Sequence, residues 1–181
     1  CGTEVKLPEI PEKEVEAVGA AKTIEEILKE LGKDVKLARE GANNWSVKEG
    51  SAKIKITYNP DNFFIAGDAY LCQLPSDAQK IKPLYQFLLE ENHRTNGLVL
   101  SCVKQNIVLS SIIYDLDMTK ESGANIFRNL FRQADYYDDF LKKEYSCTDR
   151  LEEEDPASFI SPTRPVCSTR NNLPKNRRCK N

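Results

Sequence analysis

Three segments of the chain place hydrophobic residues at helical spacing. In the first, Thr23 and Glu26 form the pattern of a capping box, in which two side chains satisfy free N–H groups at a helix start. Gly32 supplies the residue type that most readily adopts the left-handed conformation after a helix end. The apolar positions between them share one face: Ile24, Ile27, Leu28 and Leu31. The pattern predicts a short amphipathic helix.

Two longer helices are predicted further along the chain. The second covers residues 76–92, with a core-facing stripe of Ile81, Leu84, Tyr85, Leu88 and Leu89. Pro83 either removes one hydrogen bond inside this helix or lies near the first turn of a helix that follows a short turn. The third covers residues 119–145, with apolar positions at Ile126, Leu130, Phe131, Ala134, Tyr137 and Leu141.

Alternation of apolar and polar positions predicts strands between the helices. Residues 43–62 predict a hairpin of two strands that turns at residues 49–51. In its second strand, Ala52, Ile54, Ile56 and Tyr58 alternate with Lys53, Lys55 and Thr57. One face of this strand is therefore buried and the other wet, as in an antiparallel sheet covered on one side. Residues 63–75 predict a third strand with a bulge at Gly67, and residues 97–118 predict a hairpin of two mostly buried strands.

The order of these elements is helix, three strands, helix, two strands, helix. Helices packed on an antiparallel sheet form an α+β fold, and residues 22–145 hold all of these elements. Residues 1–21 are charged, contain two prolines and lack a sustained period, so they predict an N-terminal tether. Residues 146–181 hold an acidic run and then a basic end, with few large apolar residues. They predict an extended polar tail.

Charge is distributed unevenly along a chain whose net charge is -2. The last 20 residues carry six basic and no acidic side chains, whereas the other 161 carry 20 basic and 28 acidic ones. An acidic body argues against nucleic acid as a partner, because duplex binding needs clustered cations. No run approaches the roughly 18–20 apolar residues that a membrane-spanning helix needs.

Several local sequences resemble the type III secretion chaperone-like superfamily, in particular the YbjN-type proteins. The resemblance covers about residues 22–145. It rests on the leading helix, a strand ending in QLP, the helix PLYQFLLEENH, the hairpin GLVLSCVKQNIVLSSIIYDL and the aromatic helix NIFRNLFRQADYYDDFL. It implies a non-enzymatic module that dimerises or holds an extended segment of a partner protein. The chain differs from the compact family pattern by its tether, its basic tail and its N-terminal cysteine.

Two functional hypotheses follow. In the first, the domain binds a partner protein or forms a homodimer through its sheet and the region of Tyr136, Tyr137 and Phe140. In the second, the chain is an accessory subunit of a large assembly, and its polar ends wrap neighbouring subunits, because such segments order mainly on a partner.

Catalytic, metal and cofactor chemistry finds little support in the sequence. His93 is the one histidine and no motif of a known nucleophile accompanies it, while Cys102 lies in an apparently buried strand where a thiolate is disfavoured. The other cysteines lack the C-x-x-C spacing of a zinc site. We therefore predict no enzyme, no metal and no cofactor. Buried Cys72 is expected to stay reduced, and a disulfide is expected among Cys147, Cys167 and Cys179.

The first residue carries the prediction of localisation. Cys1 followed by a charged, proline-containing stretch is the arrangement left when a bacterial lipoprotein signal peptide is removed and the new N-terminal cysteine is acylated. This interpretation places the protein at the bacterial cell envelope, attached through lipid on Cys1. The alternative is a chain cut at this position, in an organellar or cytoplasmic complex.

Overall fold

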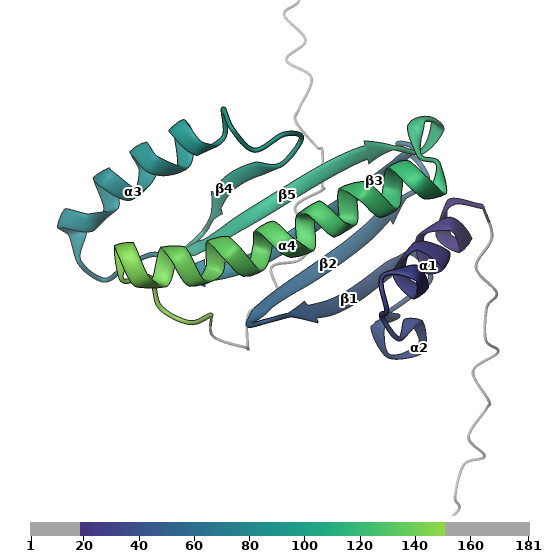
Figure 1. The fold of residues 1–181 in the computed structure, drawn as a ribbon, viewed down its shortest axis with the longest axis horizontal. Coiled ribbons are helices and arrows are strands. Elements are labelled where there is room, and N and C mark those ends of the chain that lie inside the picture. Colours follow the sequence, from purple (N-terminus) through teal and green to yellow (C-terminus); the bar gives the residue numbers. More distant parts are fainter. Residues whose placement is uncertain (1–18, 151–181) are drawn as a thin grey trace, which may run out of the picture. The chain divides into compact units, whose positions relative to one another are not determined.

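Five antiparallel strands form one sheet in the order β1-β2-β3-β5-β4 (Figure 1). The computed structural model describes residues 19–150. The strands are β1 (Asn44–Glu49), β2 (Ala52–Asn59), β3 (Phe64–Gln73), β4 (Val99–Val103) and β5 (Asn106–Tyr114). The helices are α1 (Ala20–Glu30), α2 (Val35–Ala38), α3 (Ala78–Glu91) and α4 (Lys120–Tyr145), with a 3-10 turn η1 (Asp115–Asp117) before α4. The predicted α+β fold and its order of main elements are confirmed.

The long helix α4 lies across one face of the sheet, and α1 packs beside it over the β1 and β2 side (Figure 1). The facing side chains of β2 and β3 are fully buried, among them Ile54, Ile56 and Ile65. The alternate residues of β2 point to the other face, where Lys53 and Lys55 are partly exposed. The core therefore lies between the sheet and α4, as the alternation in the sequence predicts.

Gly67 allows α4 to lie close to the middle of the sheet. A Cβ atom at this position would lie 2.8 Å from Leu130 Cδ2 of α4 and 2.9 Å from Ser111 Oγ of β5. The bulge predicted at Gly67 is wrong, because Gly67 pairs regularly with Ile56 and Ser111. The register shift of β3 instead lies between Tyr70 and Gln73.

Helix α1 begins earlier than its capping-box pattern predicts. The helix starts at Ala20, so Thr23 lies inside the first turn, and its hydroxyl donates to the Gly19 carbonyl at 3.4 Å. The predicted end is confirmed, because Gly32 has a φ of 74°. A reciprocal cap is present on α4 instead, where Thr119 and Ser122 bond each other's backbone N–H groups.

The predicted core stripe of α3 is only half correct. Leu84 and Leu88 are buried, but Tyr85 and Leu89 are 41% and 73% exposed. The reason is that α3 packs against β4 at the edge of the sheet, so a narrow stripe suffices to cover its contact. Pro83 lies inside the helix, which Asp77 caps by accepting from the Gln79 N–H.

The chain remains on the sheet after α4 ends. Thr148 pairs with Gln73 through two backbone hydrogen bonds of 2.9 and 3.2 Å, and Cys147 beside it is buried. The sequence places these residues in the tail, whereas the structure packs them against β3. Within residues 19–150, every helix is too short or too polar to cross a membrane.

Candidate partner-binding surface

Two aromatic side chains on the outward face of α4 form the centre of the candidate surface. Tyr136 and Phe140 are one helical turn apart, and their rings stack with centroids 5.9 Å apart. Tyr136 is 55% exposed, whereas Phe140 is partly buried. A large exposed aromatic ring held by its neighbour can bind a partner with little loss of rotamer freedom.

Phe140 also joins α4 to α3. Its ring stacks on Phe87 of α3 with centroids 5.0 Å apart, and Tyr145 lies 5.4 Å from Phe87. Offset aromatic pairs of this kind contribute about 0.5–1.5 kcal/mol each beyond burial of their area. The aromatic cluster therefore fixes the C-terminal half of α4 against the edge of the fold.

Tyr137 packs against this cluster from the core side of α4 and is 3% exposed. Its hydroxyl donates to Glu91 Oε1 at 3.0 Å, and the edge of its ring meets Tyr136 at 5.2 Å. Burial and the bond to Glu91 raise the pKa of Tyr137 well above its ordinary range. Of the three residues predicted to contact a partner, Tyr136 and Phe140 reach the surface and Tyr137 does not.

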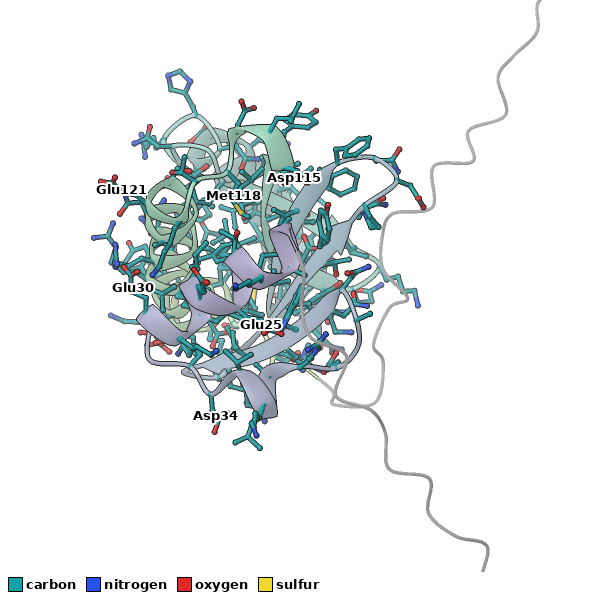
Figure 2. All side chains as sticks on the ribbon, turned by 90° about the vertical axis from the view of Figure 1, so that its right-hand side faces the viewer. Glu25, Glu30, Asp34, Asp115, Met118 and Glu121 are labelled. Atoms are coloured by element: carbon teal, nitrogen blue, oxygen red, sulfur yellow. The ribbon has the colours of Figure 1, made fainter. Side chains whose placement is uncertain are left out.

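Two open hollows lie along α4 and share Arg132 and Asp135. The first, about 480 Å³, lies between α1 and α4. Its charged groups pair with each other: Arg128 with Glu30 at 3.8 Å, and Lys33 with Glu49. Figure 2 shows Glu30 beside α4, where Lys120 also reaches it at 3.6 Å.

The second hollow, about 420 Å³, runs along α4 beside Tyr136 and Phe140. Four charged side chains line it as well, two basic and two acidic: Arg132, Lys143, Asp135 and Asp139. An aromatic floor with mixed charges at its margin resembles the apolar centre and polar rim of protein interfaces. The chemistry of this hollow suits a peptide segment better than a charged small molecule.

The residues considered for catalysis lie elsewhere. The prediction that Cys102 is buried is wrong, because it lies exposed on the edge strand β4. Partial desolvation of its thiol nevertheless raises the pKa of Cys102, although contact with Tyr85 acts in the opposite direction. His93 is exposed just past α3, and within residues 19–150 no hydrogen bond links it to Cys102. The same part of the chain holds no cluster of three or more side chains suited to a metal ion.

Cys72 of β3 is buried as predicted, and it lies beside Cys147, which the sequence does not indicate. Contact with Cys147 and burial raise the pKa of Cys72. Contact with Cys72 lowers the pKa of Cys147, against the opposing effect of burial. Cys1, Cys167 and Cys179 lie outside the described residues. Lipid on Cys1, the envelope location and a tail disulfide therefore stay predictions.

Comparison with known proteins identifies the fold. No protein-family model and no curated protein sequence matches the chain. Several solved structures are similar over about two thirds of it. The structure of the heterodimeric ExoU–SpcU complex from the type III secretion system of Pseudomonas aeruginosa matches with a TM-score of 0.52 and 13% identity, over 66% of this chain and 98% of that one.

The other two similar structures agree with the first. YbjN of E. coli matches with a TM-score of 0.51 and 14% identity, over 69% of this chain and 92% of that one. The HopA1–SchA chaperone–effector complex matches with 0.50 and 8%, over 65% and 91%. The chain has the type III secretion chaperone-like fold. At these identities the likeness establishes the fold alone, so the role of the α4 surface is argued from its own residues.

Proposed function

We propose that this chain is a non-enzymatic protein-binding module that holds a segment of a partner protein on the aromatic surface of α4. The observation that carries the proposal is Tyr136, which is 55% exposed, stacked on Phe140 and placed beside a hollow of about 420 Å³. Two of the similar structures are complexes between two proteins, which supports the same class of role.

The composition of the surface indicates what the partner segment offers. Tyr136 and Phe140 present ring faces that favour aliphatic or aromatic side chains. Around them, Arg132 and Lys143 flank Asp135 and Asp139 along α4, so charge on the partner sets orientation and specificity more than affinity. A short segment with two or three apolar residues and charges of both signs fits this description.

Site-specific photocrosslinking tests the proposal. A benzophenone amino acid replaces Tyr136 in one variant and Leu37 in a control, since Leu37 is 84% exposed on α2 and distant in sequence from α4. We expect the Tyr136 variant to capture one protein reproducibly from native extracts, and the Leu37 variant not to capture it. Equal capture at both positions, or none at Tyr136, contradicts the proposal.

Binding measurements with the captured partner then test the contact itself. Tyr136→Ala removes an exposed anchor, and truncation of such an anchor costs about 2 kcal/mol or more, or roughly 30-fold in affinity. Leu37→Ala is expected to leave the affinity unchanged. Capture of a second copy of this chain would show that the surface forms a homodimer. Capture only within a large assembly would favour the accessory-subunit hypothesis.

A further inference from the structure

Two buried cysteines from distant parts of the sequence meet at the C-terminal end of α4. Cys72 belongs to β3 and Cys147 follows α4, 75 positions later in the chain. Cys72 is fully buried and Cys147 is 7% exposed, so both side chains belong to the core. Their residue neighbours Gln73 and Thr148 pair directly through two backbone hydrogen bonds.

This backbone pairing sets the relation of the two thiols. In a β-ladder, successive side chains point to opposite faces, so the residues before Gln73 and before Thr148 share the face opposite to theirs. That face is the core, where Cys72 and Cys147 are diagonal neighbours across the antiparallel pairing of Gln73 with Thr148. The position and the burial of the two side chains are thus set by one local structure.

The segment that carries Cys147 is held by few contacts. Ser146 leaves α4 in the left-handed conformation, with a φ of 58°. Two hydrogen bonds hold its start: Lys80 donates to the Ser146 hydroxyl at 2.5 Å, and the Cys147 N–H donates to the Leu141 carbonyl at 3.4 Å. The rest is held by the Gln73–Thr148 pairing, an ion pair of 2.6 Å between Lys142 and Asp149, and the Arg150 guanidinium 5.9 Å from the Tyr70 ring. A segment held by so few interactions can shift by the small amount that bond formation needs.

A buried carboxylate lies beside the two thiols. Asp138 is 1% exposed, and its Oδ2 accepts from Lys142 and Ser51. Contact with Cys147 and burial raise the pKa of Cys72, whereas contact with Cys72 lowers the pKa of Cys147. Cys147 is also the more accessible of the two, so it is the thiol that an added oxidant meets first.

We propose that Cys72 and Cys147 are a redox-active pair whose disulfide fastens the C-terminal end of α4 to β3. A small-molecule disulfide is the oxidant. The Cys147 thiolate attacks it, forms a mixed disulfide and releases one small thiol. The Cys72 thiol then loses its proton to water and attacks the Cys147 sulfur, which forms the intramolecular bond and releases the second small thiol. The two cysteines lose two electrons and two protons, and the oxidant gains them.

The experiment uses the full chain with Cys1, Cys102, Cys167 and Cys179 replaced by serine, so that only the pair remains. The chain is incubated with oxidised glutathione, and its intact mass is measured. We expect a loss of two hydrogen atoms, one linked Cys72–Cys147 peptide, and reversal by dithiothreitol. A further Cys147→Ser substitution is the matched control and must abolish the change.

The unfolding temperature shows whether the disulfide is compatible with the native fold or distorts it. A disulfide that closes a loop of this length stabilises a domain by restricting the unfolded chain, and we expect the unfolding temperature to rise by about 10 °C. The same chain in denaturant provides the positive control for oxidation. A link that forms only in denaturant, a link that lowers the unfolding temperature, or glutathione retained on Cys147 without closure each overturns the proposal.

Discussion

At the scale of single residues, Gly67 is the position where the distance between α4 and the sheet is decided. Alanine there would place a Cβ atom within 3 Å of Leu130 and Ser111. We expect Gly67→Ala to lower the free energy of unfolding by about 1–3 kcal/mol, because extra volume in a packed core forces neighbours to move. Urea unfolding followed by circular dichroism measures the change.

Gly41 provides the matched control for this substitution. A Cβ atom at Gly41 would meet only Asn44 Nδ2, at an ordinary distance of 3.7 Å. Gly41→Ala should therefore change stability by less than about 0.5 kcal/mol. Equal effects at both glycines would show that the cost at Gly67 does not come from contact with α4.

A second prediction at this scale concerns the hydroxyl of Tyr137. Its folded pKa is raised above the ordinary value of 10.0 by burial and by the bond to Glu91. The protonated form is thus favoured in the folded state, so its stabilising effect is complete below pH 10 and is lost as the pH rises through the folded pKa.

Tyr137→Phe should remove this dependence at the cost of one hydrogen bond to a carboxylate. Near neutral pH we expect a loss of about 1.5–3 kcal/mol in the free energy of unfolding. Above pH 10 the difference between the two proteins should shrink. Unfolding curves at neutral pH and at a series of pH values above 10 test this, and a constant difference across the series would contradict it.

At the scale of elements, periodicity in the sequence identifies the apolar face of a helix. It does not predict how much of that face a neighbouring element covers. Tyr85 and Leu89 continue the stripe of α3, yet the edge strand β4 covers only Leu84 and Leu88. The register of strand pairing cannot be predicted from local sequence either, because the position of the irregularity in β3 depends on its pairing with β5. The sequence pattern does not predict helix α2, because this helix is only four residues long and the capping residue Asp34 is the only indication of it.

Adjacent leucines of α3 test this difference in coverage. Leu88 is 4% exposed and Leu89 is 73% exposed. Leu88→Ala should lower the free energy of unfolding by about 2–5 kcal/mol, whereas Leu89→Ala should change it by less than about 0.5 kcal/mol. Denaturant midpoints with unchanged slopes provide the measurement. A large cost at Leu89 would mean that α3 is covered in solution by a second copy of the chain.

At the scale of the whole molecule, the sequence predicts the architecture better than the surface. The order of strands and helices follows from local patterns that agree with each other. Which side chains remain exposed depends on contacts between distant segments. Tyr137 is expected at the surface and is buried, whereas Cys102 is expected in the core and is exposed. The pairing of Gln73 with Thr148 joins β3 to the segment after α4 and brings Cys72 and Cys147 to one face, and no local pattern contains it.

Thiol labelling provides a test that reports on this whole arrangement. In the native chain, iodoacetamide should modify Cys102 on the edge strand well before Cys72 and Cys147, because it is the exposed one of the three cysteines within residues 19–150. Partial desolvation of the Cys102 thiol raises its pKa, so it should react more slowly than a peptide thiol at neutral pH. Peptide mass spectrometry after timed labelling separates the three sites, and the fully unfolded chain provides the reference rates.

The order in which the two buried thiols react then distinguishes local from global opening. If residues 146–150 detach while the sheet stays intact, Cys147 is labelled before Cys72, and its rate does not follow the free energy of unfolding. If only global unfolding exposes the pair, both cysteines react together and accelerate with denaturant. We expect the first outcome, because the segment is attached to the sheet by a single backbone pairing and its side-chain contacts lie at the surface, whereas Cys72 lies inside the central strand β3.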